Sequence, residues 1–200
     1  MTDHQTTHQA EEDARNEQIK IWLNGDIVPK DQARVSVYDS GFMLGDGVWE
    51  GLRLYNGTWA FIDEHLDRLF EAAKAIDLDI GMSHEQVFQA VSDTQKANDM
   101  ITDAHARLMV TRGVKTRPFQ HPSLSQQGPT VILACIAAEK AGADEGLMLD
   151  VNGFVNTTNA CNFFIVRKGQ VWTSTGDYCM NGITRQKVID LCRDNDIPVF

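Results

Sequence analysis

The 200-residue sequence has no hydrophobic run that approaches the roughly 20 residues of a membrane-spanning helix. It is also poor in positive charge, with 18 Lys and Arg against 28 Asp and Glu and a formal net charge of −10. Nucleic acids and anionic membranes attract basic surfaces, so we expect neither as a partner. Residues 1–18 lack the apolar core of a signal peptide, which predicts a disordered N-terminal tail and a cytoplasmic location.

Cysteine is scarce as well, and its spacing matches no common metal motif. No two of the four cysteines form a CxxC pair, and none has a histidine at the spacing of metal ligands. In a chain without a secretion signal, free buried thiols are a better interpretation than disulfides. The sequence therefore predicts no metal site, and free buried thiols at Cys135, Cys161, Cys179 and Cys192.

What the sequence does contain is a recurring Asn-Gly dipeptide between short apolar runs. It occurs at Asn24-Gly25, Asn56-Gly57 and Asn152-Gly153. Both residues of a tight hairpin turn need positive φ, which Asn and Gly adopt most easily. Three antiparallel hairpins are therefore expected, the first over residues 19–28.

Helical patterns separate the first two hairpins from the third. From Asp63, a candidate N-cap, one apolar stripe recurs at helical spacing. Ser83 and Gln86 form the signature of a capping box ahead of a second helix. The members of the stripe are Leu66, Leu69, Phe70 and Ala73.

Strands and helices segregated along the chain predict an α+β fold in two lobes. A strand is expected over residues 106–111, and the Pro-, Ser- and Gln-rich residues 116–129 are typical of a loop or a domain linker. We therefore place an N-terminal lobe at residues 19–127 and a second lobe at residues 128–200.

Two stretches have the chemistry of a phosphate site, and each has a plainer interpretation. The turn at Asn181-Gly182 leads to Thr184, a candidate N-cap; it either opens an ordinary helix or presents free backbone N–H groups to a phosphate. Arg68 adjoins the apolar stripe, and it either extends to solvent or grips a phosphate with two N–H groups. The glycines of residues 41–51 allow a ligand to approach the backbone, or they simply form turns between strands.

Together these stretches resemble the class IV (fold type IV) pyridoxal-phosphate aminotransferases. That family includes branched-chain aminotransferases, D-amino-acid transaminases and aminodeoxychorismate lyases. The similarity runs from about residue 19 to residue 200, with its markers in family order. They are "WLNGDIV", "GFMLGDGVWEGLRLY", "HLDRLFEAA", "RLMVTRG", "GADEGLMLDVNGFVN", "NFFIV" and "NGITRQKVIDL".

The resemblance implies a role for several residues. Arg68 would grip the phosphate of pyridoxal phosphate, and the turn at Gly182, Ile183 and Thr184 would offer it backbone amides. Trp49 and Arg53 would lie on the substrate side. The implied activity transfers an amino group from a branched-chain or similarly apolar amino acid to a 2-oxo acid, in a homodimer.

Three positions depart from the family pattern. The glutamate that usually keeps the pyridine nitrogen protonated is replaced by Thr157, which weakens the ring as an electron sink. A tyrosine common just before the glycine-rich stretch is replaced by Leu44, and Asn181 stands where the family usually has proline. The first two changes affect the chemistry, whereas the turn should tolerate the third.

The largest departure lies at residues 130–140. Residues 129–133 are typical of a buried strand and residues 134–140 of a helix, with no turn residue between them. In the family, further strands and the catalytic lysine separate two such elements. The sequence therefore predicts an internal deletion with its seam at residues 131–133, and the position expected for the lysine falls in "HPSLSQ", which has none.

The deletion changes the expected function. With no lysine to hold the cofactor or to move a proton, no catalytic residue is assigned; Lys140 is a conceivable substitute but is more typical of a solvated helix. The chain also ends where the family continues, so the second lobe is expected to be incomplete. An impaired aminotransferase is the main hypothesis, with a non-enzymatic remnant or a lyase of the same family as alternatives.

Overall fold

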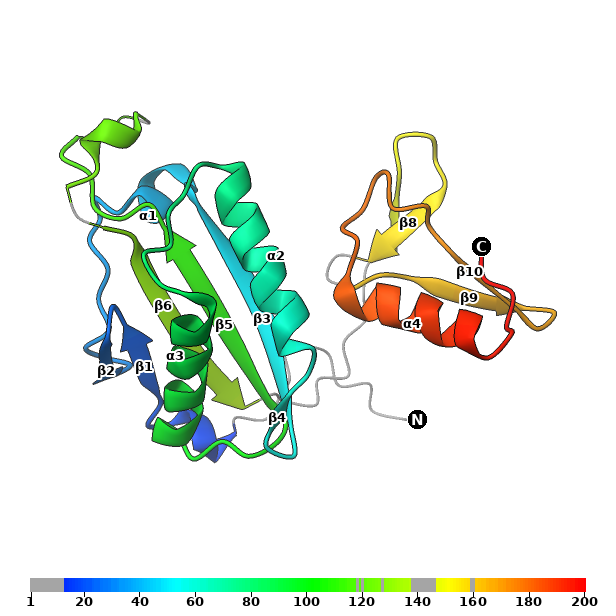
Figure 1. The fold of residues 1–200 in the computed structure, drawn as a ribbon, viewed down its shortest axis with the longest axis horizontal. Coiled ribbons are helices and arrows are strands. Elements are labelled where there is room, and N and C mark those ends of the chain that lie inside the picture. Colours follow the sequence, from blue (N-terminus) through cyan, green and yellow to red (C-terminus); the bar gives the residue numbers. More distant parts are fainter. Residues whose placement is uncertain (1–12, 118, 120, 127, 138–146, 159–160) are drawn as a thin grey trace, which may run out of the picture. The chain divides into compact units, whose positions relative to one another are not determined.

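The computed structural model describes residues 13–117, 119, 121–126, 128–137, 147–158 and 161–200 (Figure 1). The chain divides into two compact units, of which the larger spans Glu11–Lys140. The smaller unit contains the described residues from 147 to 200. In the described part of the chain, no helix has the length and apolar character needed to cross a membrane.

The larger unit is built on a six-stranded sheet in which every neighbouring pair is antiparallel. The predicted hairpins at both Asn-Gly sites are confirmed, because Asn24 (φ 52°) with Gly25 (φ 106°), and Asn56 (φ 48°) with Gly57 (φ 78°), all adopt positive φ. In sheet order, the strands are β2 (Asp26–Pro29), β1 (Lys20–Leu23), β6 (Thr130–Ala137), β5 (Ala104–Thr111), β3 (Gly47–Tyr55) and β4 (Thr58–Trp59).

Two long helices cover the same face of this sheet (Figure 1). Helix α2 (Ile62–Ala75) buries the predicted stripe through Leu66, Leu69 and Ala73, and helix α3 (His84–Ala97) begins with the predicted capping box. The N-cap of α2 is Phe61 and not Asp63, which lies in the first turn where its charge complements the helix dipole. A short helix, α1 (Ser40–Leu44), precedes β3.

Strand β6 corrects the prediction for residues 130–140. The segment stays extended to Ala137, with unbroken register from Thr130 opposite Thr111 to Ala137 opposite Ala104 of β5. Hydrogen bonding to β5 on one side and to β1 on the other overrides the helical preference of an Ala-rich sequence. The helix predicted over residues 134–140 is therefore wrong as far as 137, and residues 138–140 lie outside the described residues.

The position of β6 also places the boundary between the two lobes later in the chain than the sequence predicts. Because β6 belongs to the sheet of the larger unit, that unit extends beyond the predicted end at residue 127. The segment over residues 116–129 joins the neighbouring strands β5 and β6 and contains a 3-10 turn at Pro122–Leu124. It is a connection inside one sheet and not a linker between lobes.

The described residues of the smaller unit form two hairpins and one helix. The hairpin predicted at Asn152-Gly153 forms, but only Gly153 has positive φ (84°), because the Asp150 carboxylate accepts hydrogen bonds from the N–H groups of Asn152 and Phe154. Lys168-Gly169 (φ 52° and 74°) makes a tight hairpin that the sequence did not reveal. The elements are β7 (Leu147–Leu149), β8 (Val155–Thr158), β9 (Phe164–Arg167), β10 (Gln170–Thr173) and α4 (Ile183–Asp194).

The N-terminal residues and the cysteines depart from two expectations. Of the tail predicted at residues 1–18, residues 1–12 lie outside the described part, whereas Ala14–Asn16 forms a 3-10 turn and Arg15 donates to the Thr102 carbonyl at 2.9 Å. Cys161, Cys179 and Cys192 are free thiols, but only Cys192 is buried and Cys161 is exposed. Cys135 lies in β6, and its side chain is outside the described residues.

Candidate functional site

Arg68 is held by a carboxylate that the sequence did not single out. Its Nε donates to Glu50 Oε1 at 2.6 Å and its Nη2 to Glu50 Oε2 at 2.7 Å, so helix α2 and strand β3 are joined by a two-pronged ion pair. His65, one helical turn earlier, brings Nδ1 to 2.7 Å from Glu50 Oε2. Glu50 is 3% exposed and Arg68 keeps 30% of its side chain exposed, so the pair lies at the border of the covered face.

The charges of this pair are stable near neutral pH. Burial of Glu50 would raise its pKa, but hydrogen bonds from Arg68 and His65 outweigh burial and hold the pKa below the ordinary glutamate range. The hydrogen bonds from Arg68 to Glu50 raise the pKa of Arg68 in turn. Since the carboxylate is ionised, it only accepts, and Nδ1 of His65 carries the hydrogen of their contact.

The two predicted substrate residues lie on the opposite face of β3, which the helices leave uncovered. Trp49 and Arg53 alternate with Glu50 and Leu52, whose side chains are buried under α2. Arg53 lies directly opposite His105 in β5. Arg107 stacks on the Trp49 ring, with its guanidinium carbon 4.0 Å from the ring centre.

On strands β3 and β5, the positive charge of this open face has no neighbouring carboxylate among the described residues. On strands β3 and β5, the described side chains of the face include Arg53, Arg107 and His105 and no acidic residue. The neighbouring positions of β6 are apolar, Ile132 and Ala134. Burial, and then the charges of Arg53 and Arg107, lower the pKa of His105. The face therefore combines an apolar surface with cations that suit a carboxylate or phosphate group.

Arg68 and Arg53 flank one edge of the sheet although they lie on opposite faces. Strand β3 pairs with β4 only at Leu54 and Tyr55, so its segment from residue 47 to residue 53 has no strand on its outer side among the described residues. An anion that bound beside this edge could be reached by side chains from both faces of β3.

In the smaller unit, the predicted phosphate-binding turn does open a helix. Gly182 is the N-cap of α4, while Ile183 and Thr184 lie in its first turn, so the prediction of Thr184 as N-cap is wrong. The Gly182 backbone packs so closely on Asn162 that a Cβ there would collide with Asn162 Oδ1. The turn is fixed further by Asn162 Nδ2, which donates to the Met180 carbonyl at 2.9 Å.

Arg185, in the first turn of α4, is a further residue that the sequence did not reveal. It is 8% exposed; its Nη2 donates to the Ser174 carbonyl at 2.5 Å and its Nη1 lies 3.4 Å from Asn181 Oδ1. Its Nε has no hydrogen-bond partner in the described part of the chain. A buried cation is unfavourable beside the positive end of a helix dipole, and a bound anion would relieve both charges.

Thr157 does not supply what a protonated ring nitrogen needs. Its Oγ1 donates to the Cys161 carbonyl at 2.6 Å, so the hydroxyl hydrogen is used inside the loop after β8. The described residues therefore fit the phosphate end of pyridoxal phosphate better than its ring nitrogen. That Arg68 and Gly182–Thr184 share one phosphate stays a prediction, since they belong to different units.

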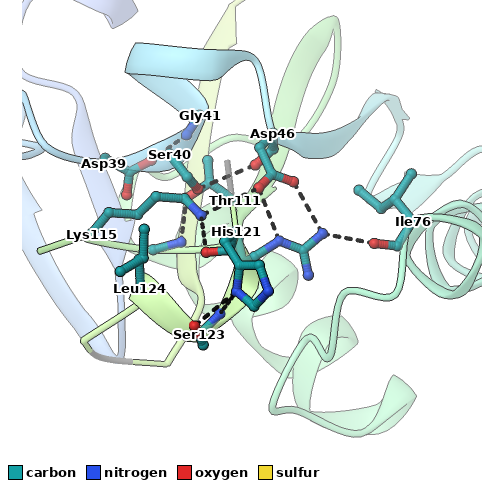
Figure 2. A network of polar contacts seen from close by, with 12 residues as sticks. Asp39, Ser40, Gly41, Asp46, Ile76, Thr111, Lys115, His121, Ser123 and Leu124 are labelled. Atoms are coloured by element: carbon teal, nitrogen blue, oxygen red, sulfur yellow. Dashed lines mark hydrogen bonds and ion pairs between the residues drawn. The ribbon is translucent and has the colours of Figure 1, made fainter. Parts of the chain in front are cut away.

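A second polar cluster lies at the end of β5 and has no exposed cation (Figure 2). Lys115 is fully buried and lies 4.0 Å from Asp46, which accepts two hydrogen bonds from Arg112 at 2.9 and 3.1 Å. Arg112 also donates to the carbonyls of Ile76 and Asp77, at the C-terminal end of α2. Because these contacts join α2, β5 and the segment before β3, the cluster holds the framework of the unit together.

Comparison with known proteins gives the same family for both units. The family model described as amino-transferase class IV matches residues 47–136 and 128–199. A "branched-chain-amino-acid aminotransferase-like protein 1" of Arabidopsis thaliana is 34% identical over 88% of this chain, which spans only 40% of that relative's length. A "putative branched-chain-amino-acid aminotransferase" of Methanocaldococcus jannaschii is 35% identical over 90% of this chain and 77% of its own.

The fold is similar to that of solved enzymes. The structure of the branched-chain amino acid aminotransferase from Escherichia coli superimposes with a TM-score of 0.79 at 25% identity, over 92% of this chain and 76% of that one. A large part of the two-lobed framework is therefore shared, with about a quarter of the solved chain unmatched.

The alignments also locate a missing internal segment. The match with the Arabidopsis protein runs over 220 positions, whereas 88% of this 200-residue chain is 176 residues, so about 44 positions have no counterpart here. The two family matches overlap at residues 128–136, which fit both the end of one segment and the start of the next. The predicted seam at residues 131–133 lies inside this overlap, and β6 runs through it as one continuous strand.

Proposed function

Because the chain belongs to the class IV aminotransferases, we propose that it retains phosphate-recognising parts of a pyridoxal-phosphate site but transfers amino groups inefficiently. The residues proposed to recognise phosphate are Arg68 on helix α2 of the larger unit and, in the smaller unit, the first turn of α4 with the buried Arg185. When bound, pyridoxal phosphate supplies the electron sink for chemistry at the substrate's Cα. The chain's own residues bind and orient the cofactor.

The observation that carries the proposal is the gap of about 44 aligned positions. The family's catalytic lysine belongs to the stretch between the two elements that meet near residues 128–137, and "HPSLSQ" contains no lysine. Lys115 is a poor substitute because its side chain is fully buried in a structural cluster. Loss of a general acid–base group lowers rates typically by about 10² to 10⁴-fold.

Thr157 supports the same proposal independently. A carboxylate at this position would favour the protonated pyridine nitrogen, but the Thr157 hydroxyl donates to a backbone carbonyl. With the ring nitrogen unsupported, the cofactor would withdraw electrons less strongly. The defect would add to the loss of the lysine.

The substrates that suit the open face are an amino acid with an apolar side chain and a 2-oxo acid. Trp49, Ile132 and Ala134 offer apolar surface, whereas Arg53 and Arg107 offer charge for carboxylates. We propose a branched-chain amino acid as the amino donor. The uncovered sheet face also supports a homodimer, because an apolar face of this kind is normally covered, and we place the protein in the cytoplasm.

The test uses the purified full chain with pyridoxal phosphate, L-leucine or L-valine, and 2-oxoglutarate, with glutamate formation as the readout. We expect turnover well below about 1 s⁻¹, the lower end of the usual enzyme range. Turnover at or above that rate would overturn the proposal, and Lys140→Ala would then show whether that residue has taken over.

Cofactor binding is measured separately by quenching of tryptophan fluorescence. We expect pyridoxal phosphate to bind and inorganic phosphate to compete with it, and Arg68→Gln to weaken both. Absence of binding would leave the non-enzymatic remnant as the correct alternative.

A further inference from the structure

The ion pair between Glu50 and Arg68 has a consequence for how a phosphate is bound. We infer that Glu50 is a positioning residue that fixes the direction in which Arg68 presents its guanidinium group to the phosphate. The inference rests on the proposed function, because it concerns the same phosphate site. It assigns a role to a buried carboxylate that itself would repel the ligand.

The geometry of the pair fixes the plane of the guanidinium group. Two parallel contacts, at 2.6 and 2.7 Å, join the Nε–Nη2 edge of Arg68 to both oxygens of Glu50. A single contact would leave the plane free to rotate, whereas two define it. An arginine side chain has about 2 kcal/mol of rotamer entropy, and the pair removes part of that freedom before a phosphate arrives.

Glu50 is itself held firmly enough to serve as a reference point. It lies in β3, which pairs with β5 over eight positions from Gly47 to Leu54, and its side chain is 3% exposed. Nδ1 of His65 also donates to Oε2 of the carboxylate, the oxygen that accepts from Arg68 Nη2. The neighbours Leu66 and Leu69 are buried in the core, so α2 cannot rotate to release Arg68.

The ion pair with Glu50 weakens the charge of Arg68, and this loss is easier to explain if the pair serves phosphate binding. Glu50 neutralises the charge of Arg68, which weakens long-range attraction of a phosphate. In exchange the guanidinium is oriented, and binding energy of the phosphate is not spent on ordering it. A pair that served only stability would not make phosphate affinity depend on Glu50.

The same unit contains a matched control for this distinction. Asp46 and Arg112 form another two-pronged pair, at 2.9 and 3.1 Å, with side chains 21% and 14% exposed. Arg112 donates further to the carbonyls of Ile76 and Asp77, so this pair supports the end of α2. Asp46→Asn therefore breaks a two-pronged ion pair that does not involve Arg68, and it also removes the carboxylate 4.0 Å from Lys115.

The experiment compares Glu50→Gln, Asp46→Asn and Arg68→Gln in the full chain. Dissociation constants are measured by tryptophan fluorescence for pyridoxal phosphate, for inorganic phosphate and for pyridoxal, which lacks the phosphate. We expect Glu50→Gln to weaken both phosphate-bearing ligands about tenfold, which corresponds to about 1.4 kcal/mol, and to leave pyridoxal unchanged. Asp46→Asn should change none of the three.

The outcomes separate the inference from the proposed function. If Arg68→Gln weakens phosphate binding but Glu50→Gln does not, or if Asp46→Asn has the same effect as Glu50→Gln, the inference is wrong and the phosphate site stands. If the wild-type chain binds no phosphate-bearing ligand, both are wrong. Should Glu50→Gln fail to fold, Glu50→Asp serves instead, with a smaller loss expected because the shorter carboxylate keeps its charge but reaches Arg68 less well.

Discussion

The guanidinium carbon of Arg107 lies 4.0 Å from the centre of the Trp49 ring, on the sheet face that the helices leave uncovered. Each residue comes from a different strand, and their contact aligns the cationic side chains with an aromatic surface that is 56% exposed. His105 lies two residues before Arg107 and opposite Arg53, so three basic groups share this face. Their mutual repulsion can be measured.

The first prediction concerns the titration of His105. Burial and the charges of Arg53 and Arg107 lower its pKa, so its imidazole should titrate below the ordinary histidine range in NMR spectra. Arg53→Gln should raise that pKa, because one repelling charge is removed. Lys74→Gln, on helix α2 over the other face of the sheet, should leave it unchanged, and an equal pKa in the Arg53 variant and the wild type would contradict the assignment.

The same shift has a consequence for stability. Because the unfolded histidine has the higher pKa, about 6.5, the unfolded chain binds more protons below that pH. The contribution of His105 to the free energy of unfolding should therefore fall as pH decreases below about 6.5. In His105→Gln this part of the pH dependence should disappear from urea denaturation curves, and its persistence would assign it to another group.

A second loss of stability, at lower pH than that of His105, is expected from Glu50. Its folded-state pKa is lowered, so its contribution is complete above the ordinary glutamate pKa and is lost as pH falls through the lower folded value. Glu50→Gln should cost about 1–3 kcal/mol at pH 7 and should flatten the acid side of the stability profile. A variant with wild-type acid sensitivity would show that other carboxylates determine it.

Removing the buried charge of Lys115 should lower the free energy of unfolding substantially. Lys115→Met keeps the volume of the side chain but removes the ammonium group from the cluster with Asp46 (Figure 2). We expect the free energy of unfolding to drop by about 3 kcal/mol, in the range for breaking a buried ion pair. The exposed Lys74→Met is the control and should change it by no more than about 0.5 kcal/mol.

The larger unit should fold without the smaller one. Every residue of its hydrophobic core cluster lies between Trp22 and Leu133. A fragment of residues 11–140 should therefore show a single cooperative thermal transition by circular dichroism. A fragment with helical and strand signals but no cooperative transition would show that the core needs the second unit.

Features that depend on neighbouring residues were predictable from the sequence. The turns at Asn24-Gly25 and Asn56-Gly57 and the capping box at Ser83 and Gln86 need only local chemistry, and all were confirmed. The helix predicted at residues 134–137 was wrong because these residues become a strand by pairing with β1 and β5, which lie more than 20 residues away in the sequence.

The sequence also did not reveal which side chains, far apart along the chain, pair in the fold. Glu50 meets Arg68 across 18 positions and Lys115 meets Asp46 across 69, distances at which one sequence gives no pairing signal. Arg185 had a weak signal, a charged residue near the apolar side of a predicted helix. The phosphate-binding residues could be proposed, but not the groups that orient them.

The order of strands in the sheet sets when it can be completed during synthesis. Strand β1 is translated first, yet its inner neighbour is β6, and Ile21 pairs with Ala134. Until β6 emerges, the β1–β2 hairpin has no docking partner and β5 exposes an open edge, so the nascent chain carries two unsatisfied strand edges. Pairing over such a long separation requires a large loop to close, which predicts slow folding that gains from chaperone protection while the ribosome completes the strand.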